Sequence, residues 1–202
     1  MAGMSPKTLL VGSPDGLHYA FDLQGSRLGK AWRGRFFNAR GTWHARAGAL
    51  ENPPTDHVLI LPQGAPLAVL GDPPGVWPQA MGRDAGYRRL GRRFDADGMP
   101  TFRYRVEHFE VEEFPHPETQ RDGIWLARSF HLSPPPTSQD NLYLRLLLSD
   151  SIRREGADTF ATGDGTLVRV QKNARTLLRA SGDQNELLLL IDGPETDVSW
   201  TW

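Results

Sequence analysis

Glycine and proline punctuate this chain along its whole length and divide it into short runs whose hydrophobic residues alternate. The sequence has 21 glycines and 16 prolines among 202 residues. Short alternating runs between such breaks are typical of antiparallel β-strands. No stretch longer than two turns has the periodicity of an amphipathic helix. The pattern therefore predicts an all-β fold with little helix.

The alternation predicts about a dozen strands. They are expected near 8–12, 17–23, 27–37, 57–61, 87–94, 101–107, 124–132, 142–148, 159–162, 167–171, 176–180, 186–191 and 198–202. One turn of helix is expected within 149–155, and 62–86 reads as a long Pro/Gly-rich loop that Trp77 partly anchors. We expect residues 1–202 to form a single antiparallel two-sheet β-sandwich, similar to a super-sandwich. A closed or partly open β-barrel is the alternative.

Composition excludes several classes of chemistry. The absence of cysteine excludes disulfides, zinc–thiolate and iron–sulfur sites, covalent haem attachment and a cysteine nucleophile. The six histidines have no zinc-ligand spacing, so we predict neither a metal site nor a cofactor. A net charge of -1 argues against a nucleic-acid partner. No apolar run approaches the roughly 20 residues of a membrane span.

Glutamates and arginines crowd the middle of the chain. An arginine-rich hairpin is predicted at 87–107; Glu107 ends it, and Glu110, Glu112 and Glu113 follow. Paired carboxylates could supply the acid and base of a glycosidase. Cross-strand Arg–Glu pairs on the wet face of a sheet are the favoured interpretation. The chain has no nucleophile elbow, Walker loop or dinucleotide-binding glycine motif, so no catalytic residue is assigned.

The segment 31–48 is the richest in ligand-binding side chains, because it combines two tryptophans, four arginines and one histidine. Trp43 would stack on a ring while neighbouring cationic groups make hydrogen bonds. The predicted ligand-binding residues are Arg33, Trp43, His44 and Arg46, together with Arg103 and Arg105 of the hairpin. In the alternative interpretation, Trp32 is a core residue and Trp43 anchors a loop. Trp200 and Trp202 at the end of the chain either pack inside or form an interaction surface.

Several strings of residues carry a family resemblance. They are Gly-Leu-His-Tyr-Ala-Phe-Asp at 16–22, Trp-Arg-Gly-Arg-Phe at 32–36, Gly-Thr-Trp-His-Ala-Arg-Ala-Gly at 41–48, the hairpin at 94–105 and Val-Glu-Glu at 111–113. Together they resemble a poorly characterised β-rich module of large exported bacterial proteins, over about residues 8 to 192. In those proteins the module often adjoins c-type cytochrome or sugar-dehydrogenase-like domains.

The resemblance implies an exported setting, periplasmic or extracellular, and a redox or carbohydrate context. It implies no catalytic residue, and the chain lacks the Cys-x-x-Cys-His of a c-type cytochrome. Residues 1–7 lack the apolar segment of a signal peptide, so an exported protein would carry its signal upstream of this chain. A cytoplasmic location is also compatible with the sequence.

The sequence favours a non-catalytic binding or accessory module of an exported bacterial protein, whose ligand is a carbohydrate or a partner protein domain. One alternative is a sugar-active sandwich enzyme, epimerase-like or lyase-like, with His44 or His108 as base and a glutamate as acid. Another is a self-assembling structural β protein that forms homo-oligomers through exposed strand edges and its terminal tryptophans.

Overall fold

The computed structural model describes residues 1–39 and 51–202. In these ranges the chain forms sixteen strands and two short 3-10 helices, so the all-β prediction is confirmed. The elements are β1 (Thr8–Gly12), β2 (Leu17–Asp22), β3 (Arg27–Arg33), β4 (Val58–Ile60), β5 (Leu67–Val69), η1 (Gly82–Ala85), β6 (Arg88–Phe94), β7 (Pro100–Val106), β8 (Phe109–Gln120), β9 (Gly123–Ser133), η2 (Ser138–Asp140), β10 (Leu142–Ser149), β11 (Ile152–Arg154), β12 (Thr159–Thr162), β13 (Leu167–Val170), β14 (Thr176–Ser181), β15 (Gln184–Leu190) and β16 (Glu195–Thr201).

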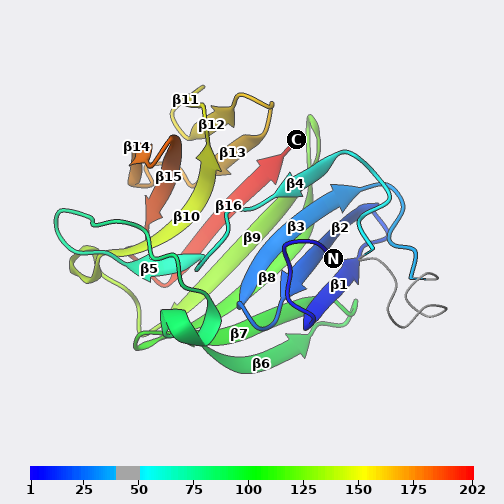
Figure 1. Ribbon diagram of the computed structural model, residues 1–202, viewed down its shortest axis with the longest axis horizontal. Helices are drawn as coiled ribbons and strands as arrows, with labels where there is room; N and C mark the ends of the chain where they lie inside the picture. The colour runs from blue at the N-terminus through cyan, green and yellow to red at the C-terminus, as the bar shows by residue number, and fades with distance from the viewer. Residues whose placement is uncertain (40–50) are drawn as a thin grey trace.

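The strands form three antiparallel sheets, shown in Figure 1. Sheet A has the order β1-β2-β3-β4, and sheet B has the order β14-β15-β10-β5. Sheet C has eight strands in the order β11-β12-β13-β16-β9-β8-β7-β6. The described strands do not close into a barrel. The predicted sandwich is thus one large sheet faced by two small ones, and its edges stay open.

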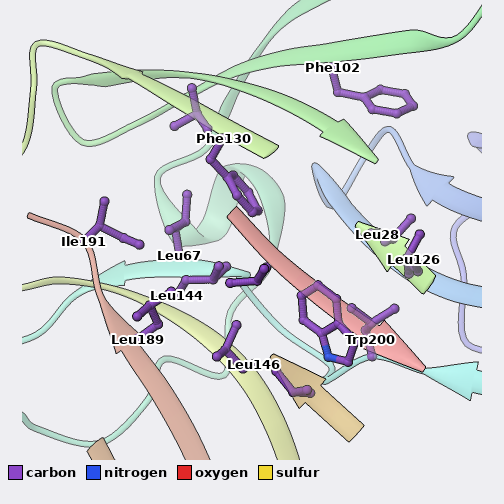
Figure 2. Packing of buried hydrophobic residues seen from close by; sticks show 14 of the residues in the cluster. Leu28, Leu67, Phe102, Leu126, Phe130, Leu144, Leu146, Leu189, Ile191 and Trp200 are labelled. Atoms are coloured by element: carbon purple, nitrogen blue, oxygen red, sulfur yellow. The ribbon is translucent and has the colours of Figure 1, made fainter. Parts of the chain in front are cut away.

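One hydrophobic core joins the three sheets. Phe21 of β2 stacks on Phe102 of β7, with ring centroids 3.6 Å apart, so sheet A packs against sheet C. Leu144 and Leu189 of sheet B belong to the same buried cluster as Trp200 of sheet C (Figure 2). Burial of apolar area at about 25 cal/mol per Å² drives this packing.

The longest strands, β8 and β9, form the middle of sheet C. They pair along their whole length, from Glu110 opposite Ser133 to Gln120 opposite Gly123. The phase of the alternation changes just before β8, and the sequence predicts a bulge or a strand break there. The structure has a break: β7 ends at Val106, and Glu107 takes a left-handed backbone conformation with φ 51° in the turn.

Two local predictions are wrong. The helical turn expected in 149–155 is instead strand β11, which pairs with β12. The long loop 62–86 contains strand β5 and helix η1.

Two histidines are built into the strands. His116 lies within β8 between two prolines. His18 is buried; it accepts from the Ser13 backbone and donates through Nε2 to the Gly34 carbonyl at 2.8 Å.

No helix in residues 1–39 and 51–202 is long and apolar enough to cross a bilayer.

Candidate functional site

Arg33, the first predicted ligand-binding residue, lies in a set of internal contacts. Its guanidinium donates to the carbonyl oxygens of Ile124 and Trp202, each at 2.7 Å, and to Oγ1 of Thr201 at 2.8 Å. It also lies 4.4 Å from the centroid of the Trp202 ring. The side chain therefore fastens the end of β16 and the start of β9 to sheet A.

Three other predicted residues, Trp43, His44 and Arg46, lie outside the described residues. Their role in ligand binding stays a prediction. Trp32, at the start of the same segment, is a fully buried core residue whose Nε1 donates to the carbonyl oxygen of Phe36 at 2.7 Å.

Arg103 and Arg105 lie in a ladder of cross-strand ion pairs on sheet C. Arg103 pairs with Glu112 at 3.1 Å, and Arg105 pairs with Glu110. Arg93 also reaches Glu112, at 2.7 Å. The favoured interpretation of the Arg/Glu cluster is confirmed for these glutamates, because the pairs are partly exposed and cross-strand.

The structure does not bring Arg33 close to this ladder. Arg105 of β7 is opposite Glu110 of β8, and Glu110 is opposite Ser133 at one end of β9. Arg33 contacts Ile124, nine residues earlier on the same strand. At about 3.3 Å per residue the two sites are separated by roughly 30 Å. They cannot share one small ligand.

Glu113 is the member of the glutamate cluster for which the wet-face prediction is wrong. It is fully buried, and its Oε1 accepts from Nε of Arg128 at 2.8 Å while Nη2 lies 2.7 Å away. Its Oε2 accepts from the Tyr104 hydroxyl at 2.9 Å. The sequence did carry a signal, because Glu113 continues the apolar phase of Phe109 and Val111. Every charge in this group has a partner, so it cross-links neighbouring strands of sheet C.

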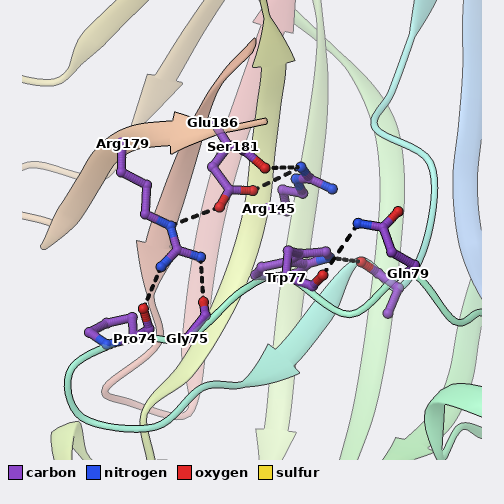
Figure 3. Close-up of polar contacts among 9 residues, drawn as sticks. Pro74, Gly75, Trp77, Gln79, Arg145, Arg179, Ser181 and Glu186 are labelled. Atoms are coloured by element: carbon purple, nitrogen blue, oxygen red, sulfur yellow. Dashed lines mark hydrogen bonds and ion pairs between the residues drawn. The ribbon is translucent and has the colours of Figure 1, made fainter. Parts of the chain in front are cut away.

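A second buried ion-pair group lies on sheet B, under the loop that precedes η1 (Figure 3). Nη2 of Arg145 lies 2.8 Å from Oε2 of Glu186, and Nε of Arg179 lies 2.8 Å from Oε1 of the same carboxylate. The two Nη atoms of Arg179 donate to the backbone carbonyl oxygens of Pro74 and Gly75, at 2.6 and 2.7 Å. We call these five residues the loop clamp.

Trp77 completes the attachment of this loop. It is buried against Ala68, Leu70, Tyr143 and Leu188, and Nε1 donates to the Ala65 carbonyl at 3.0 Å. The prediction that Trp77 anchors part of the loop 62–86 is confirmed.

A cleft of about 1700 Å³ lies beside the β2–β3 turn of sheet A. Its walls are the N-terminal residues 3–8, the β2–β3 turn, and η1 with the start of β6. Gly82 brings η1 against the β2–β3 turn: its φ is +56°, and an added Cβ would lie only 2.4 Å from the Gln24 carbonyl oxygen. Only glycine allows this close approach.

The cleft carries an excess of positive charge. Five cationic side chains line it, Lys7, Arg27, Arg83, Arg88 and Arg89, against two carboxylates, Asp22 and Asp84. Lys7 and the three arginines at 83, 88 and 89 are exposed at the rim, and none of the four forms an ion pair with a described residue. The predicted arginine-rich hairpin thus contributes Arg88 and Arg89 to the cleft, while Arg103 and Arg105 lie elsewhere.

Arg27 lies at the floor of the cleft, on the side of sheet A that faces away from the core. It is opposite Asp22 on β2, next to inward-facing Leu28. Its Nη2 donates to the Gly3 carbonyl at 2.8 Å and to Oε1 of Gln63 at 3.0 Å. Only 1% of Arg27 is exposed, and burial lowers its pKa below the ordinary value.

Asp22 holds the N-terminal segment over this floor. Its carboxylate accepts from the Ser5 amide at 3.1 Å and the Ser5 hydroxyl at 2.5 Å. The amides of Gln24 and Gly25 donate to it as well, at 2.9 and 3.0 Å. Burial acts to raise the pKa of Asp22, but these hydrogen bonds together outweigh it and hold the pKa below its ordinary value.

The cleft suits the binding of anions more than acid–base chemistry. No histidine lines it. The one described histidine that contacts a carboxylate at ion-pair distance is His131, which meets Glu195 between the neighbouring strands β9 and β16, where both side chains are exposed. His108 lies in the exposed β7–β8 turn. Within residues 1–39 and 51–202 there is no cluster of three His, Asp or Glu side chains that could hold a metal ion.

Comparison with known proteins gives no match, since no family model, curated protein or solved structure is significantly similar to this chain. The resemblance to the exported β-rich module therefore stays a prediction, and the site must be interpreted from its own chemistry.

Proposed function

We propose that the protein is a non-catalytic binding module and that its ligand is an acidic carbohydrate held in the cleft. The observation that carries this proposal is the set of four exposed cations at the rim, Lys7, Arg83, Arg88 and Arg89, none of which forms an ion pair with a described carboxylate. Clustered unpaired cations raise the local concentration of an anionic ligand and speed its association.

The remaining lining supports a hydroxyl-rich ligand. Three exposed glutamines, Gln24, Gln63 and Gln79, present both donors and acceptors to the cleft. The volume of about 1700 Å³ exceeds the roughly 300–1,000 Å³ of a typical small-molecule pocket. Such a space favours several linked sugar units over a single one. The exported setting implied by the family resemblance is part of the proposal.

Charge reversal at the rim tests the proposal. We expect Arg89→Glu to weaken binding of fluorescein-labelled polygalacturonate by about tenfold, or about 1.4 kcal/mol. Fluorescence anisotropy at two salt concentrations would measure this loss, and wild-type binding should weaken as salt rises.

Lys172→Glu is the matched control, because it makes the same charge change at an exposed residue outside the cleft. Equal losses in the two variants would show that only net charge matters and would contradict a cleft site. Wild-type binding to single-stranded DNA as tight as to polygalacturonate would contradict a carbohydrate ligand.

A further inference from the structure

Arg27 is a buried cation that makes no ion pair. Two of its three guanidinium nitrogens, Nε and Nη1, are inaccessible to solvent and make no hydrogen bond. The third, Nη2, has neutral partners only, Gly3 and Gln63. The opposite carboxylate, Asp22, interacts with the charge of Arg27 without a direct contact, because its oxygens accept from Ser5, Gln24 and Gly25. Buried donors without an acceptor are costly, so the two free nitrogens call for a reason.

Two other buried arginines of this protein show how such a charge is normally accommodated. Arg128 is paired with Glu113 at 2.7 Å, and Arg145 is paired with Glu186 at 2.8 Å. Among these three arginines, only Arg27 makes no ion pair, and Arg27 lines the cleft. A ligand in the cleft can therefore supply the acceptors that its guanidinium lacks.

We propose that Arg27 is the specificity-determining residue of the cleft and that it binds the carboxylate of a uronic acid unit. This inference rests on the proposed function and names the acidic group. A carboxylate is planar and matches two parallel N–H groups of a guanidinium. Each such edge of Arg27 pairs Nη2 with one of the two free nitrogens.

Access to Arg27 requires a small movement of its cover. Met4 lies on Gly29, with its sulfur 3.9 Å from Nη2 of Arg27. Methionine is unbranched and flexible, so its side chain can swing away at low cost. The incoming carboxylate then replaces one neutral partner of Nη2, the Gly3 carbonyl or the Gln63 amide. Both lie at the cleft wall and can turn to water.

The test compares three polymers that differ in their acidic group: polygalacturonate, its fully methyl-esterified form and dextran sulfate. Arg27→Lys keeps the charge but loses the planar fork. We expect it to weaken polygalacturonate binding at least tenfold and dextran sulfate binding less than threefold. The wild-type protein should bind the methyl ester at least tenfold more weakly than polygalacturonate. Equal losses on the two anionic polymers, or no loss on polygalacturonate, would overturn the role of Arg27.

The outcome is separable from that of the proposed function. If Arg89→Glu abolishes polygalacturonate binding while Arg27→Lys leaves it intact, the cleft is the site but Arg27 does not read the carboxylate. If Arg27→Lys fails to fold, NMR spectra of the wild-type protein provide the test. The Arg27 Nε–H resonance must then shift on addition of D-galacturonate and stay fixed with its methyl ester; no shift with D-galacturonate overturns the inference.

Discussion

The loop clamp on sheet B and the floor of the cleft on sheet A both bury an arginine beneath a Pro/Gly-containing segment of irregular chain, with opposite electrostatic outcomes. In the clamp, Glu186 lies between Arg145 and Arg179, and the loop carbonyls accept from the two Nη atoms of Arg179. At the cleft floor, Arg27 has neutral partners for one nitrogen and none for the other two. In the first arrangement both arginines are ion-paired, whereas in the second the arginine has no ion pair and an anion can supply one.

The difference teaches that burial of an arginine by itself says little about its role. A buried charge with its counterion holds two pieces of structure together, and removing either partner leaves the other unpaired. A buried charge without a counterion destabilises the folded state unless a ligand neutralises it. Stability measurements on matched variants of the two regions can therefore separate structural arginines from binding arginines.

The largest expected effect is at the loop clamp. We expect Glu186→Gln to lower the free energy of unfolding by about 3–5 kcal/mol, because Arg145 would be buried without a counterion. Urea unfolding followed by tryptophan fluorescence measures the loss. Glu155→Gln, at the exposed pair with Arg153, is the control and should cost less than about 1 kcal/mol. Similar values for the two variants would contradict the structural role of the clamp.

A smaller, pH-dependent effect is expected at Asp22. The pKa of Asp22 is lowered in the folded state. Its contribution to the free energy of unfolding is therefore complete above the ordinary aspartate pKa of about 3.9, and it is lost as the pH falls through the folded-state pKa. We expect Asp22→Asn to cost about 1–3 kcal/mol near neutral pH and almost nothing in strong acid. Urea unfolding across that pH range measures this. Asp56→Asn, at an exposed carboxylate, controls for charge removal, and a difference that stays constant with pH would argue against the hydrogen-bonded carboxylate.

The smallest expected effect is at Arg27 itself, and it is the sharpest contrast with the clamp. We expect Arg27→Met to change the free energy of unfolding by less than about 1 kcal/mol, because relief of the unpaired charge offsets the lost hydrogen bonds to Gly3 and Gln63. Arg145→Met should cost more than about 2 kcal/mol, since Glu186 would lose a partner. Thermal or urea unfolding of the two variants measures this difference in the free energy of unfolding. An Arg27→Met variant as unstable as Arg145→Met would make Arg27 a structural residue.

Much of the strand order could be predicted from alternation and turn residues, and part of the site could not. Strands such as β12 at Thr159–Thr162 are found where the pattern places them, because glycine and aspartate fix the turn that follows. The short strand β5 was missed because it lies among the prolines and glycines of 62–86. Strand β11 was missed because its three residues include two arginines and show no apolar alternation. Arg88 and Arg89 lie in the predicted arginine-rich hairpin. Arg27 was missed because a strand-end arginine beside a turn is normally solvated.

The sequence by itself determined the class of the fold, since period-two alternation between glycine and proline breaks leaves only strands to bury the apolar residues. Because the chain has no cysteine, the sequence also excluded disulfides, thiolate metal sites and a cysteine nucleophile. Only the tertiary structure decided which charges have partners. Glu113 and Arg128 meet across β8 and β9, Glu186 meets Arg145 across sheet B, and Arg27 lies beneath Met4 without an ion pair. Pairing depends on register and on packing between segments distant in sequence, and alternation along one strand contains no information about either.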